Sequence, residues 1–184
     1  MAASSNMLPL GTVAPAFELY DTISGAKVSL EKVKSSVATV IMFICNHCPY
    51  VIHINSGIVS LTKEYTPKGI SFVAISSNDI VNYPEDSPEN MKAVGLELGY
   101  IFPYLYDETQ SVAKAYDAAC TPDLYVFDKE MKLVYRGQFD DSRPGNGKPV
   151  TGKDLRKALD NLLVGKPVDD EQIPSIGCSI KWKN

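Results

Sequence analysis

The chain has 184 residues, of which 45% are hydrophobic and 22% are charged, and its formal net charge is −4. These values are those of an ordinary globular domain, and they exclude disordered and fibrous classes of protein. The negative net charge provides no attraction for phosphate-rich partners, so neither a nucleic acid nor a membrane is expected as a partner.

The chain contains four cysteines. A chain of this length buries roughly 70% of its unfolded surface, so it does not need disulfides as staples. Residues 1–11 contain no Lys or Arg and no sustained apolar run, which is unlike a signal peptide, and a cytoplasmic location is expected. In a reducing cytosol, cysteines are more often catalytic or metal-binding than disulfide-bonded.

The first part of the chain predicts an arm, a hairpin and a buried strand. Residues 1–12 are expected to form a flexible arm, and the alternating runs 16–20 and 26–30, separated by a turn, predict a β-hairpin. A single helical turn is expected over 31–35. Residues 39–44 are apolar or β-branched at every position, which predicts a parallel strand buried on both faces.

Two cysteines directly follow this strand. Cys45 and Cys48 precede a run of apolar residues at helical spacing, so they are expected in a strand-to-helix turn. Pro49 is suited to the first helical position, because its missing N–H would have no partner there. The free N–H groups and the positive dipole end of a helix favour a thiolate, as does a protonated His47, and a lowered pKa is therefore predicted for Cys45.

The remaining chain alternates strands with helices. Residues 70–76 repeat the buried-strand pattern, so the two strands and the helix between them predict a right-handed βαβ unit. Beyond it we expect a polar loop (77–86), a helix (88–98), a short strand (102–106), a short helix, an antiparallel pair of strands (123–127 and 131–136), a loop (140–152) and a last helix after Thr151. Pro103 in the short strand suggests an edge strand or the beginning of a strand. Residues 13–165 are thus expected to form one α/β domain, with a central mixed sheet flanked by helices. The tail 166–184 is expected to pack on this domain or on a neighbouring molecule.

This order of elements is similar to the thioredoxin fold over nearly the whole chain. The matching features are a C-x-x-C turn after a buried strand and Thr121–Pro122 opening a later strand. The N-terminal hairpin and the additional helix and strand over 87–106 resemble the branch named for alkyl hydroperoxide reductase and thiol-specific antioxidant proteins. The segments CNHCPYV (45–51) and PSIGCSIKW (174–182) resemble a peroxiredoxin-like group of small thioredoxin-family proteins.

The resemblance implies a role for each residue of the turn. Cys45 matches the exposed nucleophile and Cys48 the buried resolving thiol. Thr121–Pro122 matches a peptide whose proline is cis and packs beside the disulfide. His47 and Pro49 are supporting residues of the site, and a histidine between the cysteines resembles the more oxidising members of the superfamily. No organic cofactor and no metal is implied.

Some positions differ from the thioredoxin pattern. Thr39 stands where thioredoxins bury an acidic proton acceptor, and Ile44 stands where they carry a tryptophan. The resemblance therefore leaves the acceptor of the proton of Cys48 open. Cys120 directly precedes the proline peptide and Cys178 lies in the tail, and both are candidates for additional redox thiols. For Cys120, a small buried hydrophobic residue is an equal alternative.

The predicted function is thiol–disulfide exchange. Exchange requires a thiolate that attacks and a second thiol close enough to release the mixed disulfide, and Cys45 and Cys48 supply both. A more stable thiolate makes the oxidised form a stronger oxidant, so a reduction potential above that of thioredoxin is predicted. The expected partners are a protein or small-molecule disulfide or thiol, and an unknown reducing system.

A peroxiredoxin-like thiol peroxidase is one alternative, and it would use Cys48. The sequence Cys48–Pro49 has the form of the peroxidatic motif, again at a helix N-terminus. Peroxiredoxins, however, place a threonine three residues before that cysteine, where this chain has Cys45. Arg136 or Arg143 would have to complete such a site.

A non-catalytic thiol-binding or zinc-binding module is the alternative from another class. Its ligands would be Cys45 and Cys48 with His47 or His53 and a further cysteine. Tetrahedral zinc sites need four ligands, usually from two paired motifs, and this chain has one C-x-x-C pair.

Overall fold

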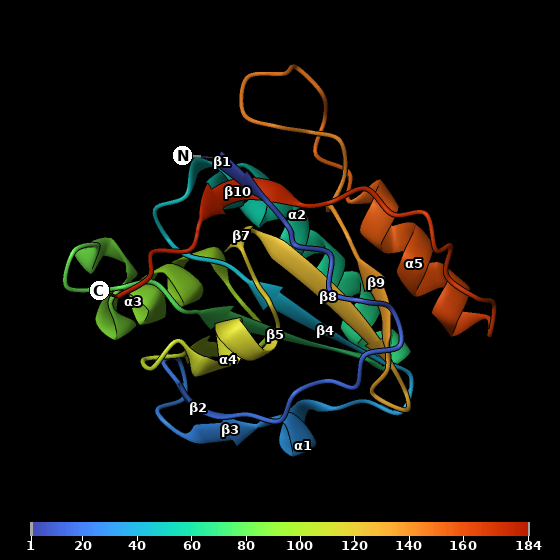
Figure 1. The fold of residues 1–184 in the computed structure, drawn as a ribbon, viewed down its shortest axis with the longest axis horizontal. Helices are drawn as coiled ribbons and strands as arrows, with labels where there is room; N and C mark the ends of the chain where they lie inside the picture. Colours follow the sequence, from blue (N-terminus) through green and yellow to red (C-terminus); the bar gives the residue numbers. More distant parts are fainter. Residues whose placement is uncertain (1, 184) are drawn as a thin grey trace.

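The computed structural model describes residues 2–183 and contains two sheets (Figure 1). The larger sheet has the strand order β3-β2-β6-β5-β4-β8-β9 and the smaller one β1-β10-β7. The strands are β1 (Ala2–Ser4), β2 (Glu18–Asp21), β3 (Lys27–Ser29), β4 (Ala38–Phe43), β5 (Ile70–Ser76), β6 (Tyr104–Tyr106), β7 (Cys120–Thr121), β8 (Asp123–Asp128), β9 (Leu133–Arg136) and β10 (Ile176–Ser179). The helices are α1 (Leu30–Val33), α2 (Pro49–Tyr65), α3 (Pro88–Leu98), α4 (Ser111–Ala115) and α5 (Lys153–Leu163), with 3₁₀ turns η1 (Thr66–Lys68) and η2 (Pro84–Asp86).

Strand β4 is the centre of the larger sheet, and every one of its residues is buried. It pairs in parallel with β5 and antiparallel with β8. Val40 and Met42 face a core cluster built with α2, α3 and α5, whereas Ile41 and Phe43 face the cluster that contains α4. The predicted strand buried on both faces, and the mixed sheet flanked by helices, are confirmed (Figure 1).

Of the two explanations expected for Pro103, an edge strand or the beginning of a strand, the structure shows the second, because β6 starts at Tyr104. Strand β6 lies inside the sheet, between β5 and β2. The hairpin supplies the extra neighbour, because Tyr20 of β2 pairs with Tyr106. Pro103 precedes the strand, where it needs no ladder hydrogen bond, and its carbonyl accepts a hydrogen bond from Ala74 N at 2.9 Å.

The two ends of the chain meet in the smaller sheet, which sequence periodicity did not predict. Residues 2–4 were expected in a flexible arm, but they form β1, which pairs antiparallel with β10 of the tail (Figure 1). Strand β10 in turn pairs with β7, so that Cys178 lies opposite Thr121. Pairing satisfies backbone groups that a free arm would leave to water. No helix in the described part of the chain is long and apolar enough to cross a bilayer.

Candidate active site

Cys45 and Cys48 lie in the turn between β4 and α2, as predicted. Cys48 is the N-cap residue of α2 and Pro49 occupies the first turn of the helix. Both cysteines are free thiols, and both are buried: Cys45 is 2% exposed and Cys48 is fully enclosed. The turn therefore places two thiols at the carboxyl end of a central strand and at the N-terminus of a helix, where positive potential favours negative charge.

The peptide between Thr121 and Pro122 is cis and faces this turn. The hydroxyl of Thr121 lies 3.3 Å from Sγ of Cys45, and the carbonyl oxygen of Thr121 lies 3.1 Å from Sγ of Cys48, which donates to it when the thiol is protonated. One residue therefore contacts both sulfur atoms. The structure brings together the cysteines and the proline peptide that the sequence places more than seventy positions apart.

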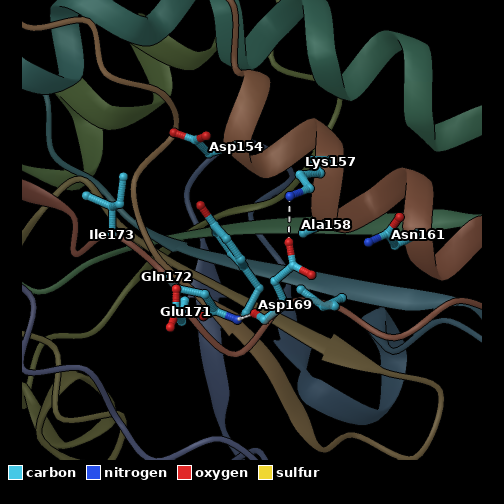
Figure 2. Close-up of a pocket in the computed structure, with 10 residues that line it drawn as sticks. Asp154, Lys157, Ala158, Asn161, Asp169, Glu171, Gln172 and Ile173 are labelled. Atoms are coloured by element: carbon cyan, nitrogen blue, oxygen red, sulfur yellow. Dashed lines mark hydrogen bonds and ion pairs between the residues drawn. The ribbon is translucent and has the colours of Figure 1, made fainter.

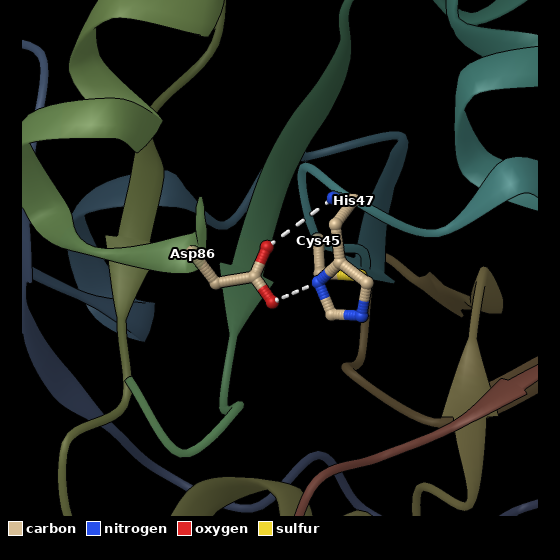
Figure 3. Close-up of side chains that lie close together, drawn as sticks. All are labelled: Cys45, His47 and Asp86. Atoms are coloured by element: carbon tan, nitrogen blue, oxygen red, sulfur yellow. Dashed lines mark hydrogen bonds and ion pairs between the residues drawn. The ribbon is translucent and has the colours of Figure 1, made fainter. Parts of the chain in front are cut away.

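A buried carboxylate, Asp86 of η2, holds the turn from the other side (Figure 3). Its Oδ1 accepts the N–H of Asn46 at 2.7 Å, and its Oδ2 accepts from Nδ1 of His47 at 2.7 Å and from Nδ2 of Asn78 at 2.8 Å. The ring of His47 stacks on Tyr83, with 5.3 Å between ring centroids. Asp86 thus fixes both residues that separate the two cysteines.

Asp86 is not singled out by the sequence pattern, which predicts a polar loop over residues 77–86. A signal did exist: the loop follows β5, and β5 is the parallel neighbour of β4. The carboxyl ends of adjacent parallel strands meet at one edge of a sheet, so the loop after β5 and the cysteine turn after β4 had to be neighbours. Nothing in the residue pattern distinguishes Asp86 from Asp79 of the same loop.

The predicted lowering of the Cys45 pKa is wrong. The proton shared with Cys48, burial and the carboxylate of Asp86 raise the pKa of the Cys45 thiol. The pKa of Cys48 is lowered to about 4, first because Cys45 donates to it, and then through the Cys178 thiol and the N–H groups of Val51 and Cys178, against the opposing effect of burial. The negative charge of the pair therefore rests on Cys48, the residue that caps the helix.

The two remaining cysteines have different surroundings. Cys178 packs against the core cluster that contains Cys48, and it is half-buried. Cys120 is buried, its thiol donates to the carbonyl of Pro122 at 3.5 Å, and burial followed by the charge of Asp123 raises its pKa. Of the two candidate additional thiols, Cys178 is the one that shares contacts with the turn.

The arginines proposed for a peroxidase site are engaged elsewhere. Nε of Arg136 donates to the carbonyl of Leu8 at 3.0 Å, and its Nη1 donates to Gln172 at 2.9 Å. The guanidinium of Arg143 donates to the carbonyl of Asp140 at 2.7 Å and to the side chain of Gln138 at 2.6 Å. Both guanidinium groups are bound to protein acceptors that do not belong to the cysteine turn.

A possible group of metal ligands in the described part of the chain consists of Cys45, His47 and Asp86, with one ligand atom each within 4.8 Å of the others (Figure 3). These are three ligands, whereas a structural zinc site needs four, and two of them already bind each other. His53 lies in a different place, in a cavity lined by Tyr50 and Pro122. The zinc alternative stays untested.

A separate pocket lies between α5 and residues 168–173 (Figure 2). Nζ of Lys157 forms an ion pair with Oδ2 of Asp169 at 2.5 Å across it, and Nε2 of Gln172 donates to the carbonyl of Asp169 at 2.7 Å. No cysteine and no residue of the turn lines this pocket. It contributes nothing to the chemistry of the thiols.

Comparison with known proteins gives a family and a fold. Residues 10–136 match the AhpC/TSA family. The chain is 67% identical to an uncharacterized conserved protein from Geobacillus kaustophilus (TM-score 0.98, covering 100% of this chain and 97% of that one). It is 50% identical to a hypothetical protein from Sinorhizobium meliloti 1021 (TM-score 0.95, 98% of both chains).

A more distant structure is similar in fold. The thioredoxin domain of a thiol–disulfide oxidoreductase from Bacteroides vulgatus has 19% identity and a TM-score of 0.64, over 83% of this chain and 99% of that one. This likeness confirms the predicted thioredoxin-like fold. No curated protein matches the sequence.

Proposed function

The chain belongs to the AhpC/TSA family, and from this premise we propose that it is a thiol–disulfide oxidoreductase that works through Cys45 and Cys48. The observation that carries the proposal is that both thiols lie in the turn at the N-terminus of α2 and that both sulfur atoms contact the same residue, Thr121. A second thiol close to the first is what disulfide exchange needs to resolve a mixed disulfide.

Cys45 is the thiol that meets the substrate in this proposal. Cys48 is fully enclosed, whereas Cys45 retains 2% exposure and is followed by the half-buried Asn46 and His47. The proton of Cys45 passes to the thiolate of Cys48, and Sγ of Cys45 attacks a sulfur of the substrate disulfide. One bond between Cys45 and the substrate forms, the substrate disulfide breaks, and its other sulfur leaves as a thiolate that takes up a proton.

Cys48 completes the cycle. Cys48 passes its proton to the substrate thiolate that has left, and its sulfur then attacks Sγ of Cys45. The Cys45–Cys48 disulfide forms, and the second substrate sulfur leaves as a thiolate that takes up a proton from solvent. The substrate gains two electrons and the cysteine pair loses them. Thr39 plays no part as a proton acceptor, because its hydroxyl accepts the N–H of Ser35 at 2.9 Å. The pair itself holds the proton that thioredoxins give to a buried acid.

Stabilisation of a thiolate also sets the reduction potential that we propose for the pair. The lowered pKa of Cys48 stabilises the reduced pair, which raises the reduction potential and makes the disulfide a stronger oxidant than that of thioredoxin. The proposed substrate is a protein or small-molecule disulfide or thiol in the cytoplasm, and a cellular reducing system is the proposed electron donor.

Turnover of insulin and of hydrogen peroxide, measured side by side, tests the proposal. The wild type and Cys120→Ser should reduce insulin, while Cys45→Ser and Cys48→Ser should lose this activity, because each lacks one of the two sulfurs that exchange. Cys120 is the matched control, since it is a buried cysteine next to the same proline peptide. Insulin reduction by Cys45→Ser at the wild-type rate would overturn the assignment.

A peroxidase that uses Cys48 is the second candidate, and one observation favours it: the charge of the pair rests on Cys48, directly before Pro49 at the helix N-terminus. The position of the orienting threonine is taken by Cys45, and Arg136 and Arg143 are bound elsewhere. Peroxide consumption that survives Cys45→Ser and disappears in Cys48→Ser would favour this function over disulfide exchange.

A further inference from the structure

The pairing of β10 with β7 orients the side chain of Cys178 toward the redox turn. Cys178 lies directly opposite Thr121 in the antiparallel ladder. Side chains of directly opposed residues lie on the same face of a sheet. The hydroxyl of Thr121 points to Cys45, at 3.3 Å from its sulfur, so Cys178 projects on the face that the redox cysteines occupy. Cys120 and Ser179, the next pair, project on the opposite face.

Gly177 allows β10 to approach the turn closely. A Cβ atom at this position would lie 1.9 Å from the carbonyl oxygen of Thr121, which is backbone and has no room to move aside. The same carbonyl oxygen lies 3.1 Å from Sγ of Cys48. Cys178 packs against the core cluster that contains Cys48. The strand therefore lies directly against the peptide group that holds the enclosed cysteine.

The four cysteines also differ in access to solvent. Cys45, Cys48 and Cys120 are buried, and Cys178 is half-buried. Cys178 is thus the thiol of the cluster that presents most surface to an external thiol or disulfide. Its contact with Cys48, which has no exposed surface, offers a path from solvent to the enclosed sulfur.

We propose that Cys178 is a third redox thiol of this site, and that it exchanges with the Cys45–Cys48 disulfide. This inference rests on the proposed function. The sulfur of Cys178 gives up its proton and attacks Sγ of Cys48. A Cys48–Cys178 bond forms, the Cys45–Cys48 bond breaks, and Cys45 leaves as a thiolate that takes up a proton. No electrons enter or leave in this step, and the disulfide moves to a position that an external thiol can reach.

The charge of Cys48 makes this exchange depend on the redox state. In the reduced protein, burial and then the interaction with Cys48 raise the pKa of Cys178 to about 11, against an opposing effect of Lys181. Once Cys48 is in a disulfide, its sulfur carries no negative charge and no longer accepts a hydrogen bond from the thiol of Cys178. The effect of Cys48 that raises the pKa of Cys178 is then lost, and this pKa falls. Cys178 becomes a better nucleophile when a disulfide is present for it to attack.

Peptide mapping of the oxidised protein tests the proposal. Tryptic peptide 35–63 carries both Cys45 and Cys48, peptide 158–181 carries Cys178, and peptide 115–129 carries Cys120. The full-length protein is equilibrated in a series of glutathione redox buffers and quenched with acid, and its free thiols are alkylated before digestion. A disulfide that links 35–63 to 158–181 reports exchange with Cys178, whereas loss of two hydrogens within 35–63 reports the Cys45–Cys48 disulfide.

We expect the linked pair of peptides in the wild type, with Cys45 alkylated, and a larger fraction of it in Cys45→Ser. Cys48→Ser and Cys178→Ser should lack it, and Cys120→Ser should match the wild type. The inference would be overturned, and the proposed function left intact, if the linked pair is absent from both the wild type and Cys45→Ser. The wild type must at the same time still form the internal disulfide of peptide 35–63. Loss of the internal disulfide as well would overturn both.

Discussion

The cis peptide between Thr121 and Pro122 lies between two buried cysteines with opposite electrostatics. On one side, Cys48 occupies the N-cap position of α2, and its pKa is lowered to about 4, chiefly by the Cys45 thiol. On the other side, Cys120 lies next to Asp123, and its pKa is raised. Both thiols have 0% exposure. Burial alone therefore does not decide which thiol ionises; the polar groups that face the sulfur decide it.

Strand β10 packs against Thr121 on the Cys48 side of the cis peptide. The substitution Gly177→Val should remove this contact. The new side chain cannot fit against the carbonyl of Thr121, so β10 must move away and take Cys178 with it. We expect the free energy of unfolding to fall by about 3 kcal/mol or more, measured by urea denaturation. The control is Ile176→Ala in the same strand, at a residue that is 38% exposed; its change should stay within about 0.5 kcal/mol.

Crosslinking adds a second readout for the same variant. If Gly177→Val folds, it should lose the linkage of peptides 35–63 and 158–181 and keep the disulfide within 35–63. A variant that is as stable as the wild type would contradict the close approach of β10.

On the Cys120 side of the cis peptide, the buried carboxyl of Asp123 also has a raised pKa. Burial raises the pKa of this carboxyl from 3.8 to about 6, and its Oδ1 has no hydrogen-bond partner. Between these two pH values the folded protein binds more protons than the unfolded chain, so the free energy of unfolding falls as the pH rises through this window. Well above pH 6 the ionised carboxylate costs about 3 kcal/mol relative to acidic conditions.

The variant Asp123→Asn should remove this pH dependence. The difference in unfolding free energy between the variant and the wild type is expected to shift in favour of the variant by about 2 kcal/mol from pH 4 to pH 7. Urea denaturation at both pH values measures it, and Asp170→Asn, at an exposed carboxyl, is the control. A difference that is independent of pH would contradict a raised pKa for Asp123.

The strand, the turn and the helix that position the two cysteines could be predicted from the sequence, because the patterns that indicate them are local. The apolar run at 39–44 and the helical spacing after Pro49 were enough to place the cysteine turn, since burial and period act over neighbouring residues. Thr121–Pro122 came from resemblance to a family, because no local rule states that a distant proline packs beside a thiol. The hairpin and the βαβ unit were confirmed for the same local reasons.

The parts that sequence reasoning missed depend on long-range pairing. Strand β10 is four residues long and contains a glycine, so it has no measurable period, and its partner Thr121 lies 57 positions before Cys178. Asp86 acts on the turn from a loop after another strand. The predicted lowering of the Cys45 pKa was wrong because that pKa depends on the neighbouring Cys48 thiol, on burial and on the carboxylate of Asp86, which comes from a distant part of the chain.

Titration of thiolate absorbance tests the central claim, that the charge of the redox pair rests on Cys48. The reduced wild type should show one thiolate that forms with a midpoint near pH 4. Cys48→Ser should lose this transition. Cys45→Ala should keep it, with a higher midpoint, because the hydrogen bond from Cys45 is the largest cause of the lowered pKa. A transition that disappears in Cys45→Ala and persists in Cys48→Ser would contradict the account.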